Sequence, residues 1–352
     1  MKNRILLMAM LFGFLSACNE DKENSGGNLT PEEGKQRMTE ISDDMQNDVI
    51  EMVSSEGMEA LLDLMDLGSI AELNAKKNQT AAIRHAQTTI DNIATAFNPW
   101  KQLSEQNDDE VFDFEGNLGV YVWSFELQKF TLEDQDVDHV EMHFPSKGSE
   151  SNNAIFYLYE FEVSGDLGEP MPSKISAELL LDERLIASLS LEINYSEILG
   201  VQSADIDLFL SPFNYHLGFE VADSQVAVAV SASRDDTAIM GVDLVVVFSN
   251  FITQELERLD ATVFYRALKI EGSMDVLAME NSESLDEMNE SIDFALFYND
   301  DKIGDIVLAY NEEIDDVDLY LQYSDGSLEL LEDFFAPVLD ELEGIILELE
   351  GA

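Results

Sequence analysis

A strand-like segment near the middle of the chain carries two histidines and a glutamate at alternating positions, His139, Glu141 and His143. Because side chains alternate between the two faces of a β-strand, these three would share one face. Imidazole and carboxylate groups are ligands of zinc and related metals. The intervening Val140 and Met142 explain the segment equally well as a half-buried strand, so we predict no metal site here.

Acidic clusters raise the question of calcium binding. The segment 134–138 is similar to the start of an EF-hand loop, but His139 stands where that loop needs glycine and Pro145 where it needs its last glutamate. The EF-hand is therefore excluded. Unspecific calcium binding by acidic clusters such as 312–316 stays open.

No motif for catalysis is present. The chain lacks a Gly-x-Ser-x-Gly elbow, a His-Glu-x-x-His helix, a phosphate-binding loop and a dinucleotide fingerprint. Among 73 acidic residues no carboxylate pair can be singled out for glycoside hydrolysis. We therefore predict a protein that is not an enzyme and needs no cofactor.

The single cysteine, Cys18, ends a signal-peptide pattern. Lys2 and Arg4 precede an apolar run at 5–15, and the residues 15–18 read Leu-Ser-Ala-Cys. This segment resembles the lipobox of bacterial lipoproteins. The resemblance implies removal of residues 1–17, a thioether-linked diacylglycerol on Cys18, and acylation of the new amino end, for example with palmitate. An ordinary secretory signal is the alternative, but it would leave a lone thiol in an oxidising compartment.

Lipid on Cys18 would anchor the protein without a membrane-spanning helix, because two or more acyl chains hold a protein stably on a bilayer. Residues 18–30 are polar and contain glycine, so we expect a flexible acidic tether. Its residues Glu20, Asp21 and Glu23 resemble the surface-export signal of Bacteroidota lipoproteins. We expect an outer-membrane lipoprotein, on the cell surface or on the periplasmic face.

The charge balance excludes several partners. The chain has 73 acidic and 18 basic residues, a formal net charge of −55. Phosphate contacts need lysine and arginine, so nucleic acid is not a partner, and docking on anionic headgroups is equally disfavoured. Hydrophobic residues make up 45% of the chain, which indicates a folded protein. Because the acids are spread evenly, we interpret them as an adaptation for solubility. The oligomeric state is left open.

Residues 31–100 are expected to be helical. Thr30, Pro31 and Glu33 form a helix-start signal, and apolar residues recur at helical spacing up to Val53. Two more helices are expected at 58–67 and 80–97. At the other end of the chain, residues 331–349 carry one apolar helical face. This amphipathic helix would close the domain 101–352, which we expect to form one unit with residues 31–100.

From residue 112 onward the pattern is that of short strands divided by polar turns. It predicts an α+β, mainly β protein built on a large curved antiparallel meander sheet or half-barrel. Several strands end in acidic or Asp-Gly pairs that are typical of hairpin turns. The candidate strands are 118–126, 138–145, 154–164, 174–182, 185–195, 203–211, 213–221, 225–233, 238–249, 261–271, 273–279, 292–298, 303–310 and 317–323.

Two of these strands are apolar at consecutive positions, around 154–161 and 244–248, so both of their faces need cover. We predict a non-enzymatic lipoprotein that binds or carries a lipid or another apolar ligand in a concave sheet. The candidate lining residues, for which the opposite parity is equally open, are Ile155, Tyr157, Tyr159, Phe161, Val245 and Val247. The alternative is a structural or glycan-contacting cell-surface lipoprotein whose core is filled by its own side chains.

A second resemblance covers about the middle half of the chain. A strand ending in Phe144-Pro145 is followed by Asn152-Asn153-Ala154, which opens the next strand. This pattern, with Gly119–Trp123 before it, is similar to one in uncharacterised β-rich lipoproteins of the Bacteroidota. The resemblance implies a β-rich fold on a lipid anchor and no particular activity.

Overall fold

The computed structural model describes residues 28–58, 60 and 112–332, with gaps at 128, 147–148, 165–170, 197–199, 223, 251–254 and 312–313. Its helices are α2 (Pro31–Val53), α5 (Val276–Glu280) and α6 (Leu285–Glu290), and η2 (Glu115–Asn117) is a 3-10 turn. The strands are β1 (Gly119–Ser124), β2 (Lys129–Asp134), β3 (Val140–Phe144), β4 (Ala154–Ser164), β5 (Met171–Leu181), β6 (Arg184–Ser196), β7 (Gly200–Leu210), β8 (Phe213–Ala222), β9 (Gln225–Arg234), β10 (Thr237–Asn250), β11 (Glu255–Tyr265), β12 (Leu268–Asp275), β13 (Ile292–Tyr298), β14 (Asp301–Asn311), β15 (Asp316–Tyr323) and β16 (Leu328–Leu330).

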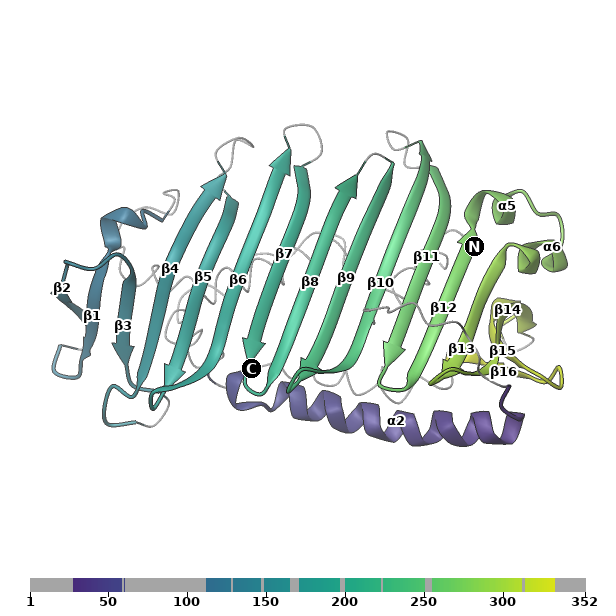
Figure 1. Cartoon of the computed structure of the whole chain (residues 1–352), viewed down its shortest axis with the longest axis horizontal. Coiled ribbons are helices and arrows are strands. Elements are labelled where there is room, and N and C mark those ends of the chain that lie inside the picture. Colours follow the sequence, from purple (N-terminus) through teal and green to yellow (C-terminus); the bar gives the residue numbers. More distant parts are fainter. Residues whose placement is uncertain are drawn as a thin grey trace. The chain divides into compact units, whose positions relative to one another are not determined.

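The fold is mainly β, which confirms the predicted class. The strands follow one another in a 16-stranded open sheet from β16 to β3, and β1 lies between β3 and β2 (Figure 1). The pairings whose register the structure describes are antiparallel, except that β1 and β3 run parallel. The signal peptide, Cys18, the tether up to residue 27 and most of the helices predicted at 58–67, 80–97 and 331–349 lie outside the described residues.

The chain divides into two compact units. Unit 1 comprises residues up to Val53 and from His216 onward, and unit 2 comprises Ser54–Tyr215. The division falls within β8, so each unit contains a contiguous run of strands.

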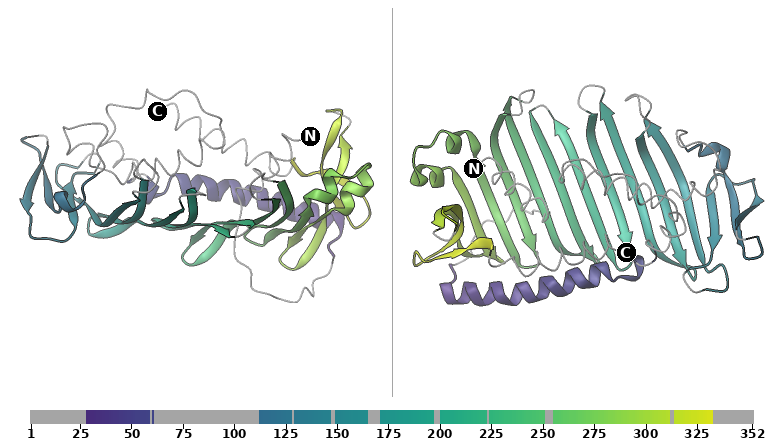
Figure 2. Two further views of the ribbon diagram at one scale, coloured as in Figure 1. Left: turned by 90° about the horizontal axis from the view of Figure 1, so that it is seen from above. Right: turned by 180° about the vertical axis from the view of Figure 1, so that it is seen from behind.

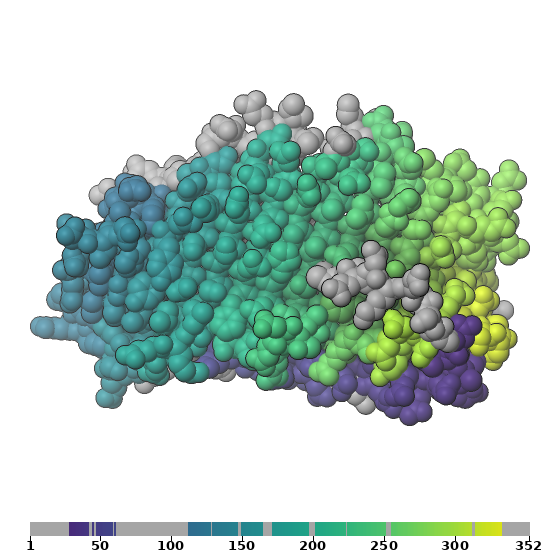
Figure 3. Space-filling model, viewed as in Figure 1, coloured from purple at the N-terminus to yellow at the C-terminus, as the bar shows by residue number. Residues whose placement is uncertain are grey.

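Unit 2 buries one face of its strands. On β3, β4 and β5 buried side chains alternate with half-exposed ones. The register places Met142 opposite Phe156 and Phe156 opposite Leu179, and each of these side chains is at most 2% exposed. Burying such a side chain contributes about 1.5–3 kcal/mol, so this face is the core of the unit. Figure 3 shows one outer face of the molecule, where side chains cover the region of these strands.

In unit 1 the helix α2 lies across the ends of β-hairpins. It begins with the predicted capping box, in which Glu33 N–H donates to Thr30 Oγ1 and Thr30 N–H donates back to the Glu33 carboxylate. Figures 1 and 2 show the helix running past the turn ends of the strands β9 to β14. Within the described residues no helix has the length and hydrophobicity needed to cross a membrane. The buried stripe of α2, at helical spacing, is Met38, Ile41, Met45, Val49 and Met52.

Two-residue turns with left-handed backbone join several strands. Asp182 and Glu183 have φ of 49° and 66°, and Asp235 and Asp236 have φ of 50° and 62°. Positive φ at both central positions is the mark of type I′ turns, whose twist matches that of the flanking strands. The acidic pairs predicted to form hairpin turns therefore do so at these two places.

The structure corrects the strands predicted at 261–271 and 273–279. Tyr265 ends β11 and Arg266, with φ of 49°, opens a turn into β12, so the first predicted strand is two strands. The second is the end of β12 followed by the short helix α5, which Asp275 caps by accepting a hydrogen bond from the Ala278 amide. No glycine or acidic pair marks the turn at Arg266, and for this reason the sequence pattern did not show it.

Candidate functional site

Three neighbouring strands of unit 2 carry polar and aromatic side chains on the face opposite the core. The register places Glu141 of β3 opposite Tyr157 of β4, and Tyr157 opposite Glu178 of β5. Because these residues alternate with the buried ones, they point away from the core. We call the following set the tyrosine–histidine face: His139, Glu141, His143, Tyr157, Tyr159 and Glu178.

Glu141 joins the two histidines of this face. Its Oε1 lies 2.5 Å from His143 Nε2, and its Oε2 lies 3.3 Å from His139 Nε2. The other ring nitrogen of His139, Nδ1, lies 3.1 Å from the Asp138 carboxylate. The predicted alternation is thus confirmed, and both imidazoles lie on one face. Each Nε2 is held by the glutamate between them, which makes a hydrogen-bonded triad.

The tyrosines form the aromatic part of the face. The rings of Tyr157 and Tyr159 are parallel within 4°, with centroids 5.6 Å apart, and the His139 ring lies 5.8 and 5.9 Å from them. The hydroxyl of Tyr159 donates to Glu178 at 3.0 Å. Tyr159 is 39% exposed. Solvent therefore reaches rings whose hydroxyl ends are surrounded by carboxylates.

A β-bulge in β4 determines which residues belong to the face. The register with β5 skips one residue between Leu158 and Glu160, so Tyr159 is the extra residue of the bulge. Beyond the bulge Phe161 lies opposite Ile175, on the core side, and its ring contacts that of Phe112 at 5.2 Å. The simple alternation expected for residues 155–161 is therefore wrong from Phe161 onward.

Carboxylates determine the electrostatics of the face. Burial lowers the pKa of His139, but hydrogen bonds to Asp138 and Glu141 outweigh it and raise the pKa above 6.5. Burial, then the hydrogen bond to Glu178, raise the pKa of Tyr159 to about 12. Both tyrosine hydroxyls are neutral at physiological pH, since burial and the charge of Glu141 also raise the pKa of Tyr157.

The other predicted lining residues have different surroundings. Ile155 is half-buried and lies opposite His143. Val245 and Val247 belong to unit 1, where they lie opposite Asp260 and Arg258 of β11. Both valines are half-exposed, and the two residues opposite them form an ion pair at 2.7 Å. The predicted set is thus divided between two units, and each part shares its face with charged groups.

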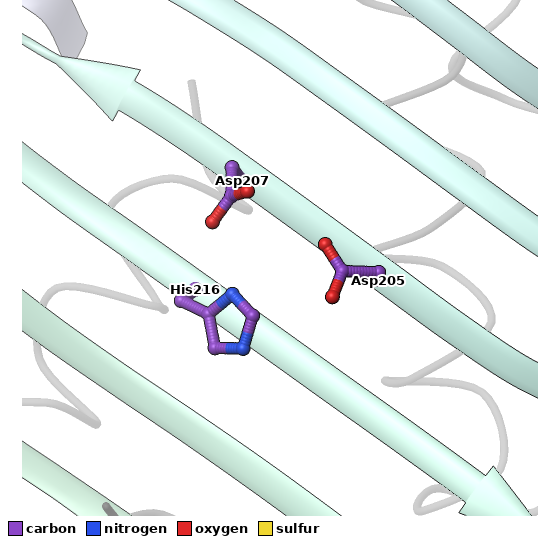
Figure 4. Close-up of side chains that lie close together, drawn as sticks. All are labelled: Asp205, Asp207 and His216. Carbon is purple, nitrogen blue, oxygen red and sulfur yellow. The ribbon is translucent and has the colours of Figure 1, made fainter. Parts of the chain in front are cut away.

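A second polar group that the sequence analysis did not single out comprises Asp205 and Asp207 of β7 and His216 of β8. One ligand atom from each lies within 4.8 Å of the others, as Figure 4 shows. Both aspartates are exposed and His216 is half-buried. The Asp-x-Asp alternation followed by a histidine was the available signal. Because exposed carboxylates commonly meet in so acidic a chain, proximity alone assigns this group no function.

Glu178 was also missed, since nothing in its own segment marks it as part of a site.

Comparison of the chain with protein-family models, with curated proteins and with solved structures finds no match.

Proposed function

We propose that this protein is a membrane-anchored, non-enzymatic surface lipoprotein that contacts glycans through its tyrosine–histidine face. The anchor rests on the lipobox resemblance at Cys18. The glycan contact rests on one observation, the parallel rings of Tyr157 and Tyr159 flanked by the carboxylates of Glu141 and Glu178.

The chemistry of a sugar ring fits these groups. Its C–H face packs on aromatic rings, and its hydroxyls donate to carboxylates and accept from imidazole N–H groups. The face offers two tyrosine rings, the acceptors Glu141 and Glu178, and the imidazoles of His139 and His143. These groups lie on one open face of three adjacent strands. A ligand there is not enclosed, which favours an extended polymer over a small molecule as the ligand.

An apolar ligand fits this face less well. Covering Glu141 and Glu178 with hydrocarbon would remove water from two ionised carboxylates, which is strongly unfavourable without new hydrogen bonds. A sugar replaces that water with hydroxyl donors. The structure therefore supports the glycan alternative of the sequence analysis better than the apolar carrier at this place.

The net charge narrows the class of glycan. At −55 the protein repels polyanions, and the repulsion is strongest at low ionic strength. We therefore expect neutral polysaccharides as ligands, and uronic-acid polymers only at high salt, where the charges are screened.

The test is affinity electrophoresis of the full-length protein in gels that contain dextran, laminarin or xylan. We expect at least one of these neutral polymers to retard the protein, and Tyr157→Ala and Tyr159→Ala to weaken the binding about tenfold or more. Tyr310→Ala is the matched control, because Tyr310 is a 53% exposed tyrosine of unit 1 whose hydroxyl also donates to a carboxylate, that of Asp315.

Retardation that Tyr310→Ala abolishes as strongly as Tyr157→Ala would contradict the assignment of the face. Unchanged mobility in all three polymers would reject the proposal as a whole.

A second candidate, the apolar carrier, rests on β10, where Leu244, Val245, Val246 and Val247 are all half-exposed although they alternate between two faces. We propose native mass spectrometry of protein purified from its own membrane. Co-purified lipid that is absent in Val247→Glu would support the carrier, and a clean apo mass in gentle detergent would reject it. Arg258 lies opposite position 247 and provides a positive charge beside the new carboxylate, and circular dichroism of the variant checks that it is folded.

A further inference from the structure

The strand β2 is an edge of the sheet. It pairs with β1 along one side, and in the described part of the chain no strand pairs with its other side (Figures 1 and 2). Lys129, Leu132, Glu133 and Asp134 are exposed on it, and the two residues between Lys129 and Leu132 are half-exposed. We propose that this edge pairs antiparallel with β2 of a second copy and makes the protein a homodimer.

The sequence of β2 is complementary to itself. In an antiparallel pair centred on Thr131, each Lys129 lies opposite Glu133 of the other copy, and each Phe130 lies opposite Leu132. Opposite charges and apolar pairs at directly facing positions stabilise an antiparallel ladder. Charge and hydrophobicity therefore match in this one register at every position from 129 to 133.

The faces match as well. In the pairing with β1, Phe130 lies opposite Trp123 and Leu132 opposite Tyr121, so both apolar residues of β2 lie on the same face. A two-fold axis normal to the sheet keeps each face on its own side, so the apolar side chains of two copies meet one another. Leu132, 42% exposed in one copy, becomes covered in the pair.

Two neighbouring carboxylates, those of Glu133 and Asp134, lie where Lys129 of a second copy would need an acidic partner. The register of β1 with β2 shifts between Val120 and Tyr121, so Glu133 is an extra residue beside Asp134. Both carboxylates are exposed and lie at the end of the strand that Lys129 of a second copy would reach.

Lys129 itself is unusual among the basic residues. Every other lysine or arginine of the described residues forms an ion pair, whereas Lys129 forms none, in a chain with 73 acids. Edge strands are often protected from self-pairing by charges, but that protection fails when opposite charges face each other. Lys129, which pairs with no acid among the described residues, is thus free of an ion pair that a second copy would have to break.

The net charge of −55 opposes association of two copies, so the dimer depends on ionic strength. The Debye length falls from about 8 Å at 0.15 M salt to about 3 Å at 1 M, which screens general repulsion more than contacts at the interface. Salt therefore favours dimerisation.

The test is sedimentation velocity of the full-length protein from 1 to 100 µM in 0.5 M sodium chloride. We expect a monomer–dimer equilibrium whose association constant falls about tenfold in Lys129→Glu, which places like charges opposite each other twice. The double variant Lys129→Glu/Glu133→Lys restores opposite charges and should restore the dimer. Lys174→Glu is the control, because it makes the same change in net charge on β5, away from the edge.

A second measurement does not depend on affinity. In a Cys18→Ser background, Thr131→Cys places two thiols opposite each other at the two-fold axis, within disulfide distance. We expect a cross-linked dimer under mild oxidation, and none from Ser190→Cys on the interior strand β6. A protein that stays monomeric at 100 µM and does not cross-link through position 131 would overturn the proposal. A dimer that Lys129→Glu leaves unchanged would also overturn it.

Discussion

The carboxylate of Asp48 accepts two hydrogen bonds from the guanidinium of Arg266, at 2.9 and 2.7 Å, although the two residues are 218 positions apart in sequence. The hydroxyl of Tyr265 donates to the same carboxylate at 2.5 Å. Asp48 is 7% exposed and lies in α2, whereas the two donors, Tyr265 and Arg266, lie at the turn between β11 and β12. These hydrogen bonds hold α2 against the turn between β11 and β12 in unit 1.

We expect Asp48→Asn to lower the free energy of unfolding by about 2 kcal/mol. Removing one partner of a buried pair costs about 3–5 kcal/mol, and solvent reaches the half-exposed Arg266, which reduces that loss. Urea unfolding measures the change. Glu40→Gln, which breaks the exposed pair with Arg37, should leave the free energy of unfolding almost unchanged, because water and salt screen an exposed ion pair. Equal losses in both variants would show that burial of Asp48 does not matter.

Gly57 should tolerate no side chain. A Cβ there would lie 2.4 Å from Ser211 N and 2.5 Å from Leu210 C, and these are backbone atoms that cannot move aside. We expect Gly57→Ala to cost about 1–3 kcal/mol in urea unfolding. In Gly218→Ala the nearest neighbour of the new methyl group, His216 Nε2, would be at 3.4 Å, so this control should stay within about 1 kcal/mol. A stable Gly57→Ala would mean that the chain before it packs differently.

The stability of the tyrosine–histidine face should depend on pH through His139. Its pKa is raised in the folded state, so the protonated form stabilises the fold; this contribution is complete below about pH 6.5 and is lost as pH rises through the folded pKa. An NMR titration of the imidazole should give a midpoint above 6.5, and Glu141→Gln should lower it. A midpoint of 6.5 or less in the wild type would contradict the hydrogen bonds to Asp138 and Glu141.

Salt should stabilise the protein without a specific calcium effect. With 73 acids and 18 bases, screening of general repulsion raises the melting temperature as sodium or potassium chloride is added. Micromolar calcium should add no further rise. A large rise in melting temperature that is specific to calcium would indicate that an acidic cluster binds the ion. The variant Asp207→Asn would then show whether Asp207, together with Asp205 and His216, holds it.

Cys18 should carry lipid in protein extracted from its membrane. Mass spectrometry of the amino-terminal peptide should find acyl chains on Cys18 and no trace of residues 1–17. Cys18→Ser should release the protein from the membrane fraction, while Ser16→Ala should leave it anchored. An unmodified, released mature protein would refute the lipoprotein assignment.

Local patterns in the sequence predicted much of the fold. The capping box of Thr30 and Glu33, the strand 154–164 and the turns at 182–183 and 235–236 were all predicted where the structure has them. Each depends on interactions between residues close together in the chain, such as a cap with its helix or one side chain with the next but one. The alternation of His139, Glu141 and His143 was predicted for the same reason.

Contacts between distant segments were decided by tertiary structure alone. The bulge that turns Phe161 into the core depends on how β4 pairs with β5, and the addition of Glu178 to the face depends on which strand becomes the neighbour. Likewise, no local pattern connects Asp48 with Arg266. By itself the sequence determined most of the strands, the turns marked by acidic pairs, and the charge. Register and burial arise only when separate segments pack together, because a shift of one residue reverses the face of every side chain beyond it.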